Sequence, residues 1–474
     1  MANQTQEILQ KHSSSSSSSS VVVIVVPFPA QSHLNQLLHL SHIISSHNIP
    51  VHYLSSALHI SQVKSRATHV LNQERIQFHG FPTPGFLSPP PNNTKFPSHQ
   101  IPSFEASVNN LREPFADLLG LLSKTARRVV IIHELLLSSV VQDSCRFPNA
   151  EVYRFSCVSS VFRLTRLRDT LGIRIGHPVY KNIPSFEESL PPEFVAFAAH
   201  QYQIGNKIKT SGHVFNTCRL IESAFLDFML EIERESDENV KLWAIGPLET
   251  VTIFKNRSNK ANGGQHKCFE WLDKQRPNSV LYISFGTTTF MEDEQIRELA
   301  LGLEQSEVHF LWVLRDADKG NVFDEGRRPK LPDGFEERVK EKGMVVRDWA
   351  PQLEILGHCS TGGFLSHCGW NSCLESLSLG VPIAAWPMHS DQPINAVLIT
   401  EVLKAGVVVR NWAQRDELVS SSAIRDAVRR LMDSEEGDEV RKRAEKLGYE
   451  LRKATAEGGI SRKELDCFIA HISR

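Results

Sequence analysis

The sequence predicts an α/β protein with two doubly wound, Rossmann-like domains that face one cleft. Strand-like apolar runs alternate with segments of helical periodicity through both halves of the chain, which is the pattern of parallel sheets covered by helices on both faces. The chain has 474 residues, too many for one hydrophobic core, so two domains of similar size are expected.

The domain boundaries follow from shifts in composition. Residues 1–20 end in eight consecutive serines and are predicted to be a disordered tail. The first domain is expected over residues 21–248 and the second over residues 266–459. The segment 249–265 between them is polar and contains Gly263 and Gly264, so it is the predicted interdomain linker.

The composition excludes several classes of protein. The formal net charge of −2 gives no reason to expect nucleic acid or an anionic membrane as a partner. The apolar run Val21–Val26 is too short to span a bilayer and follows no basic segment, so we expect neither a membrane span nor a signal peptide. The eight cysteines are scattered without a CxxC pair, as in a reduced cytoplasmic protein, and predict neither a disulfide framework nor a metal site.

The fold is predicted to begin with a central parallel strand at Val21–Val26, where every residue is β-branched. A turn at 27–32 leads into a helix that His33 opens. His33 therefore lies at the carboxyl end of a strand, where doubly wound sheets bind ligands. The helix dipole favours the neutral imidazole there, which suits a general base. For an isolated histidine, a capping or surface role is the alternative.

The rest of the first domain contains further predicted strands and one long loop. Strands are expected at 48–54, 127–132 and 214–217, and residues 243–248 close the domain. Residues 79–105 are rich in proline and aromatic side chains, which predicts a loop. This loop is either a wall of a binding pocket or a flexible surface segment.

The second domain starts near Cys268, and its first strand is expected at 279–284. The turn that follows contains Gly286 and Thr287. Its backbone N–H groups and hydroxyls can reach phosphate oxygens, although a simple helix cap is about as consistent with this short pattern. The other predicted elements of this domain include a helix at 293–303 and strands at 309–315, 344–347 and 407–410.

The segment 349–392 concentrates polar and aromatic side chains around a predicted strand–turn–helix. The strand ends at His367, and the helix is expected to begin at Asn371–Ser372, where Ser372 and Glu375 have the spacing of a capping box. The unpaired N–H groups of the helix N-terminus, with His367, Asn371 and Ser372, predict a phosphate site. Simple capping by Ser372 and Glu375 is the alternative. Gly380 is placed to end the helix.

These motifs resemble those of the plant UDP-dependent glycosyltransferases of secondary metabolism. The whole segment 349–392 resembles the donor-binding signature of that family without a gap, and PFPAQSHLNQ around His33 is similar to its opening segment. The resemblance covers essentially the whole chain after residue 20. It implies the GT-B architecture, with an N-terminal acceptor-binding domain, a C-terminal UDP-sugar-binding domain and a last helix, 460–474, that packs back on the first domain.

The resemblance also implies roles for individual residues. The implied donor contacts are uracil stacking by Trp349, base and ribose contacts by Ala350 and Gln352, ribose hydroxyl contacts by Glu375, diphosphate contacts by His367, Asn371, Ser372 and the turn at Thr287, and sugar hydroxyl contacts by Trp370, Asp391 and Gln392. A glutamine at the last of these positions is typical of members that use glucose. UDP-glucose is therefore the expected donor.

The implied reaction is an inverting displacement in which His33 removes the proton of an acceptor hydroxyl and UDP leaves. In the family an aspartate normally follows the strand at 127–132 and orients this histidine. Here the residue is Glu134, which is one methylene longer, and we predict that it still serves as the partner of His33. Ser32 stands where the family usually has glycine. No metal or other cofactor is implied, because the helix dipole takes the part of a cation, and a monomer is expected.

Within the family, five segments resemble those of the zeatin O-glucosyltransferases: 33–53, 96–114, 268–276, 349–392 and 468–473. This implies transfer to the side-chain hydroxyl of a zeatin-type cytokinin. The alternatives are another small phenolic or terpenoid acceptor, such as a flavonoid, and a nucleotide-sugar-binding protein without turnover. A dinucleotide-dependent oxidoreductase would need G-x-G-x-x-G after the first strand, which is missing.

Overall fold

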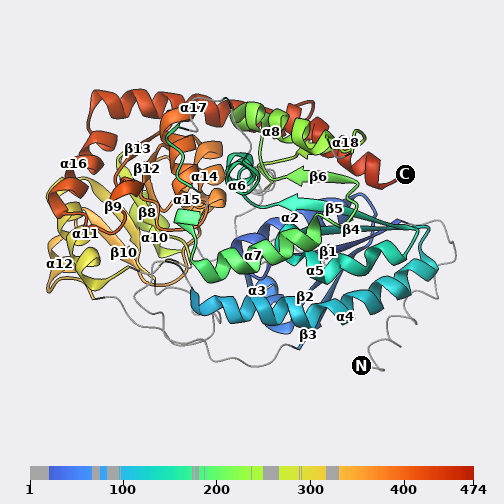
Figure 1. Cartoon of the computed structure of the whole chain (residues 1–474). Helices are drawn as coiled ribbons and strands as arrows, with labels where there is room; N and C mark the ends of the chain where they lie inside the picture. The colour runs from blue at the N-terminus through green and yellow to red at the C-terminus, as the bar shows by residue number, and fades with distance from the viewer. Residues whose placement is uncertain are drawn as a thin grey trace.

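The structure is a computed structural model of the chain, and it describes residues 21–66, 75–82, 96, 98–172, 176, 181–185, 187–235, 237–248, 266–287, 289, 291–315 and 330–474. The predicted tail at 1–20 and the predicted linker at 249–265 lie outside these residues. Figure 1 shows two α/β lobes side by side, with the next-to-last helix along the second lobe and the last helix along the first.

The first domain is built on a seven-stranded parallel sheet in the order β3-β2-β1-β4-β5-β6-β7. Its strands are β1 (Val21–Val26), β2 (Val51–Ser56), β3 (Ile76–Phe81), β4 (Arg128–Glu134), β5 (Ala150–Ser156), β6 (Gly212–Phe215) and β7 (Leu242–Ala244). The order of the strands reverses between β1 and β4, which pair over the whole length of β1. Ligands of doubly wound sheets bind at the carboxyl ends of such a strand pair.

Helices cover both faces of this sheet. They are α2 (Gln31–Ser46), α3 (Ala57–Arg66), α4 (Ile101–Thr125), α5 (Ser138–Val141), α6 (Ser160–Leu171), α7 (Pro192–Gly205) and α8 (Arg219–Arg234), with short 3₁₀ turns η2 (Ser98–Gln100), η3 (Leu135–Leu137), η4 (Gln142–Arg146) and η6 (Glu187–Ser189). The side chains of β1 alternate between the two faces of the sheet. Val21, Val23 and Val25 pack with α2 on one face, whereas Val22 and Ile24 pack with α4 on the other. A strand buried on both faces requires the uniformly apolar sequence seen here.

The second domain repeats the plan with a six-stranded parallel sheet in the order β10-β9-β8-β11-β12-β13. Its strands are β8 (Val280–Ser284), β9 (His309–Val313), β10 (Gly343–Val346), β11 (Thr361–Ser366), β12 (Ile383–Ala385) and β13 (Gly406–Val408). Its helical elements are α10 (Lys267–Leu272), α11 (Asp293–Ser306), α12 (Phe335–Arg338), α13 (Gln352–Leu356), α14 (Trp370–Leu379), α15 (Gln392–Val397), η7 (Leu398–Val402), η8 (Trp412–Gln414), α16 (Ser421–Met432) and α17 (Glu435–Thr455). The predicted fold class, two doubly wound α/β domains, is confirmed.

Some predicted boundaries were wrong. The loop expected over 79–105 begins only after β3, which continues to Phe81, and η2 and α4 start at Ser98 and Ile101. Residues 83–95 and 97 of that loop lie outside the described part of the chain. The strand expected at 127–132 continues to Glu134, so the carboxylate belongs to the end of β4 itself.

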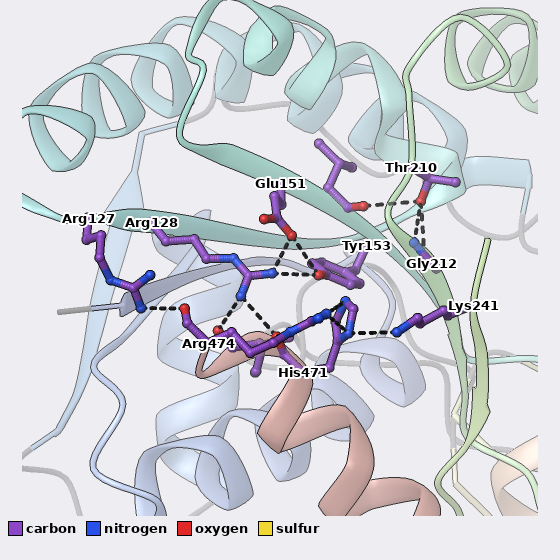
Figure 2. Close-up of polar contacts among 11 residues, drawn as sticks. Arg127, Arg128, Glu151, Tyr153, Thr210, Gly212, Lys241, His471 and Arg474 are labelled. Atoms are coloured by element: carbon purple, nitrogen blue, oxygen red, sulfur yellow. Dashed lines mark hydrogen bonds and ion pairs between the residues drawn. The ribbon is translucent and has the colours of Figure 1, made fainter. Parts of the chain in front are cut away.

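The last helix, α18 (Ile460–Ile472), packs on the sheet of the first domain. The ring of Phe468 lies edge-on to Tyr153 and Trp243, with ring centroids 5.8 and 5.2 Å apart. At its end, Arg128 of β4 donates to the carbonyl oxygens of His471 and Ile472 at 2.9 and 3.1 Å, as Figure 2 shows. Arg128 thus supplies donors to carbonyls that a helix leaves unpaired at its C-terminus.

Among the helices that the structure describes, none combines the length and the apolar character needed to cross a membrane.

Candidate active site between the two domains

A cavity of about 450 Å³ lies between the domains, at the carboxyl ends of both sheets. Its lining comes from both halves of the chain, from the turn after β1 and helix α2 on one side and from the segment 349–392 on the other. The two switch points of the sheets therefore open into one space, which is where doubly wound domains are expected to hold ligands.

His33 lies in the first turn of α2, and its imidazole Nδ1 contacts Oε2 of Glu134 directly. The other carboxylate oxygen, Oε1, accepts a hydrogen bond of 2.8 Å from the backbone N–H of Phe28. Both oxygens of Glu134 are therefore fixed, one by the turn after β1 and one by the histidine. The longer side chain of glutamate reaches His33 from the end of β4.

The environment of His33 corrects one expectation from the sequence. Burial lowers the pKa of this imidazole, but the charge and hydrogen bond of Glu134, with a smaller effect of Asp391, outweigh it and raise the pKa above 6.5. The helix dipole was expected to favour the neutral form. That expectation was wrong, because a carboxylate in direct contact exerts a stronger field than the partial charge of a helix end.

Helix α14 begins earlier than predicted. Gly369 is its N-cap, Trp370 is its first residue, and no side chain caps it. The capping box of Ser372 and Glu375 is therefore wrong, since Ser372 is already the third residue of the helix. Gly380 does end the helix, as predicted, in the left-handed conformation with φ 76°.

Without a capping role, Ser372 and Glu375 take part in a polar network beside the cavity. The amide nitrogen of Gln352 donates to Oγ of Ser372 at 3.0 Å and to the carboxylate of Glu375 at 2.7 Å. The amide oxygen of Gln352 accepts from the hydroxyl of Tyr282 at 3.3 Å. Trp349, whose side chain is 58% exposed, lies at the mouth of the same space with Ala350.

His367 packs against Gly286, in the turn after β8, and against Gly369, at the N-terminus of α14. A Cβ atom would come within 2.7 Å of its Nε2 if added to Gly286 and within 2.6 Å if added to Gly369. Burial lowers the pKa of His367 to about 4, so the ring is neutral at neutral pH. The two glycines let the backbone of both turns approach the imidazole closely, next to the free N–H groups of the helix. Thr287 lines the cavity at the first of these turns.

Asp391 and Gln392 lie at the start of α15. Burial raises the pKa of Asp391 above its ordinary value, although the hydrogen bond of 2.7 Å from Asn395 acts in the opposite direction. The amide oxygen of Gln392 accepts from the backbone N–H groups of Met388 and His389 at 2.9 and 3.0 Å. These bonds fix the orientation of the Gln392 side chain.

Trp370 is buried, and its indole N–H donates to the backbone carbonyl of Asn216 in the first domain at 2.9 Å. In this arrangement the indole N–H is not available to a sugar hydroxyl. Trp370 therefore links the two domains through its side chain while lining the cavity.

Several residues at the domain contact escaped the sequence analysis. The amide nitrogen of Gln36 contacts the side-chain oxygen of Asn371, and it donates to the carbonyl of Cys157 at 3.0 Å. Oγ of Ser159 donates to Asn395 at 2.7 Å across the same interface. One sequence pattern could have revealed Gln36. It is a polar residue within the apolar stripe of α2, and a buried polar side chain needs hydrogen-bond partners.

The first-domain side of the cavity is largely aromatic. The rings of Phe28 and Phe104 lie 4.6 Å apart, and Phe96 is edge-on to His389 with centroids 5.4 Å apart. Further apolar lining on this side comes from Ala30, Leu38, Leu136, Val158, Phe162, Leu190, Phe194 and Tyr202. Such a wall suits a flat or apolar small molecule rather than a charged one.

The predicted site residues are brought together. The residues that line the cavity are His33, Thr287, Trp349, Ala350, Gln352, His367, Trp370, Asn371, Ser372, Asp391 and Gln392. The remaining two predicted site residues contact residues of the lining: Glu134 contacts His33, and Glu375 accepts a hydrogen bond from Gln352.

Family models match both domains. The model described as glycosyltransferase, N-terminal domain, matches residues 19–250, and the model described as UDP-glucoronosyl and UDP-glucosyl transferase matches residues 257–441. The chain belongs to the UDP-glycosyltransferase family and is a transferase that uses a UDP-sugar.

Curated relatives extend over nearly the whole chain. A zeatin O-glucosyltransferase from Phaseolus lunatus is 51% identical over 453 residues, which cover 95% of this chain and 96% of the relative. A zeatin O-xylosyltransferase from Phaseolus vulgaris is 50% identical over 457 residues, which cover 95% and 97% of the two chains.

Among solved structures, a UGT transferase from Siraitia grosvenorii in complex with UDP has a TM-score of 0.74 at 30% identity and covers 96% of this chain and 100% of its own. Phytolacca americana UGT2, complexed with UDP-2fluoro-glucose and pterostilbene, has a TM-score of 0.74 at 25% identity, with 96% and 100% covered. The predicted GT-B architecture is confirmed by these relatives.

Proposed function

We propose that this enzyme transfers glucose from UDP-glucose, with inversion, to the side-chain hydroxyl of a zeatin-type cytokinin. The observation that carries the proposal is the direct contact between His33 and Glu134 at the edge of a cavity whose opposite wall is the N-terminus of α14. The identity of about half of all residues with two zeatin O-glycosyltransferases supports the choice of acceptor.

In this mechanism His33 is the general base. Its Nδ1 is held by Glu134, so its other ring nitrogen is left for the acceptor hydroxyl. As the acceptor oxygen attacks the anomeric carbon, the proton moves to the imidazole, and the carboxylate of Glu134 stabilises the resulting imidazolium. The C–O bond to UDP breaks on the opposite face of the sugar ring, which gives inversion.

The leaving diphosphate would lie at the first turn of α14. The unpaired backbone N–H groups there, with Asn371, Ser372 and the neutral ring of His367, would donate hydrogen bonds to the phosphate oxygens. Trp349, Ala350, Gln352 and Glu375 would hold the uridine, with Trp349 stacked on the base. Thr287 would contact the diphosphate, and Asp391, Gln392 and Trp370 would lie nearest the sugar.

We also propose that the reaction needs no metal or other cofactor, and that the protein acts as a monomer in the cytoplasm without nucleic-acid partners. The helix N-terminus supplies the positive field that a cation would otherwise give. Full activity after dialysis against EDTA, a monomer mass by light scattering and cytoplasmic fluorescence of a tagged protein would each support one part of this proposal.

The test is an assay of purified protein with UDP-glucose and UDP-xylose against trans-zeatin, cis-zeatin, dihydrozeatin and a flavonol, with the products identified by mass. We expect a hexose on a zeatin isomer, lost in His33→Ala and retained in His47→Ala, which changes an exposed histidine beside the other end of α2. A product only with the flavonol would refute the cytokinin acceptor. Transfer only of pentose would refute the glucose donor. UDP-glucose binding without any product would favour a binding protein.

A further inference from the structure

We propose that the catalytic pair is also a binding site for Zn²⁺, which inhibits the enzyme. A third side chain, Cys157, lies beside His33 and Glu134, and one ligand atom from each of the three lies within 4.8 Å of the others. Cys157 directly follows β5, the neighbour of β4 in the sheet. The three residues meet because β1, β4 and β5 end at the same edge of the sheet.

The three ligand types match zinc. Zn²⁺ binds thiolate sulfur, imidazole nitrogen and carboxylate oxygen at about 2.0–2.3 Å, in a tetrahedral arrangement that places the ligand atoms about 3.5 Å apart. His33 and Glu134 are in direct contact and would move apart slightly to admit the metal, and the sulfur of Cys157 already lies within 4.8 Å of both. A hard cation such as Mg²⁺ prefers oxygen ligands and would not select this set.

The charge of the site would be balanced. Glu134 and Cys157 are each 4% exposed, so an uncompensated cation between them would be costly. On binding, the thiol of Cys157 releases its proton to solvent and becomes a thiolate. One thiolate and one carboxylate then neutralise the two charges of the metal ion, and the imidazole of His33 contributes no charge.

The site is reachable. His33 and Cys157 both line the cavity, and the side chain of His33 is 18% exposed. The metal ion can enter from the cavity and keep its fourth position for a water molecule, which is the arrangement of open zinc sites.

Occupancy would stop the reaction. The metal takes the place of the proton between Nδ1 of His33 and Glu134, so the proton of the neutral ring lies on the nitrogen that faces the acceptor. That nitrogen can no longer accept the hydroxyl proton. The donor contacts proposed on α14 are not used by the metal, so zinc should lower kcat and leave UDP-glucose binding unchanged.

The test begins with binding, which does not depend on turnover. Calorimetry with the EDTA-treated enzyme should show one Zn²⁺ site, and Co²⁺ in its place should give the absorption of thiolate-to-metal charge transfer. Cys157→Ser should weaken Zn²⁺ binding by about tenfold or more and abolish that absorption. Folding of the variant is checked by its affinity for UDP, and Glu134→Gln, with the thiol intact, should weaken Zn²⁺ binding as well.

The control replaces the three exposed cysteines, Cys145, Cys359 and Cys467, with serine. This variant should bind Zn²⁺ as tightly as the parent enzyme. Zinc should also inhibit it to the same degree, when the rate with zinc is divided by the rate of the same variant without zinc. Excess acceptor should not relieve the inhibition, because the metal blocks proton transfer to His33 rather than acceptor binding. The inference is overturned if no zinc site is measured, if Cys157→Ser binds zinc as tightly as the parent, if the control loses the site, or if UDP-glucose alone relieves inhibition.

Discussion

The side-chain amide of Gln36, on α2 of the first domain, contacts the side-chain oxygen of Asn371 in the first turn of α14 of the second domain. Its amide oxygen accepts from Asn216 at 2.9 Å, so this one buried carboxamide joins three segments around the cavity. The helix that carries the proposed base is therefore tied to the helix that faces the proposed leaving group.

Replacement of Gln36 with leucine should impair both stability and the donor site. It removes the hydrogen bonds of the Gln36 carboxamide to Asn216, Asn371 and the carbonyl of Cys157, and the loss of hydrogen bonds to buried groups costs about 1–3 kcal/mol of unfolding free energy. We expect a lower melting temperature and a higher KM for UDP-glucose. Gln275→Leu, which removes only a bond to the carbonyl of Trp271, is the matched control. Equal KM values in the two variants would contradict a role for Gln36 at the site.

The carboxylate of Glu134 should be needed for turnover rather than for donor binding. Glu134→Gln removes the charge that supports the imidazolium, and kcat/KM should fall by about 10²–10⁴-fold with the affinity for UDP unchanged. Glu134→Asp keeps the charge but shortens the side chain and should give an intermediate rate. Steady-state kinetics and UDP calorimetry measure these effects. If Glu134→Gln turned over like the parent, the proposed pair would be wrong.

Because the packing around His367 is close, one methyl group added at Gly369 should impair both donor binding and stability. Gly369→Ala places a Cβ 2.6 Å from the imidazole, and φ at this position is −59°, so the effect is steric and not a backbone penalty. We expect the KM for UDP-glucose to rise by about tenfold and the protein to lose about 1–3 kcal/mol of stability. Gly120→Ala on α4, where the nearest atom is 3.7 Å away, should leave the KM unchanged and raise the stability by up to about 1 kcal/mol, because alanine is more favourable than glycine in a helix interior.

The exposed indole of Trp349 should contribute to donor affinity without contributing to folding. Stacking of a base on an aromatic side chain is worth about 1–3 kcal/mol, so Trp349→Ala should weaken UDP binding by about 5- to 150-fold. Its melting temperature should match that of the parent, since the side chain is 58% exposed. Tyr449→Ala removes another exposed aromatic ring, on α17, and should change neither value. Unchanged UDP affinity in Trp349→Ala would refute the stacking role.

Buried neutral histidines should make the fold sensitive to acid. Burial lowers the pKa of His59 and of His79 to about 4, below the ordinary value of 6.5. The unfolded chain then takes up protons at a higher pH than the native chain. Stability is complete above pH 6.5 and falls as the pH drops from 6.5 toward 4.

For His59 alone the loss should reach about 2 kcal/mol near pH 5. Urea unfolding at several pH values measures it, and His59→Gln should show a weaker pH dependence than the parent over this range. His47→Gln is the control, because His47 is exposed. Parallel pH profiles for His59→Gln and the parent would contradict the assignment.

The sequence predicted those features that depend on local pattern. The apolar run of β1 and the left-handed Gly380 at the end of α14 are determined by a few neighbouring residues, and both were predicted. The start of α14 was not, because Ser372 and Glu375 had the spacing of a cap while Gly369 actually occupies that position. A short polar pattern cannot distinguish a cap from a pair of side chains that face a cavity.

Other features depend on contacts between distant segments. Gln36 and Asn371 are 335 positions apart, and no local pattern relates them. The protonation of His33 likewise depends on a carboxylate 101 positions away, which outweighs the helix dipole considered from the sequence. The meeting of the predicted donor and catalytic residues at one cavity could be predicted only from the resemblance to a family. That resemblance carries information on contacts between distant segments, which composition and periodicity lack.

The docking of α18 has a consequence for motion between the domains. The chain passes from the first domain to the second between residues 248 and 266, and it returns between α17 and α18. Of these two connections, the return between α17 and α18 spans only residues 456–459, and Arg128 anchors the far end of α18 on the first domain. This short return is therefore expected to be the pivot for any opening of the cavity during substrate exchange.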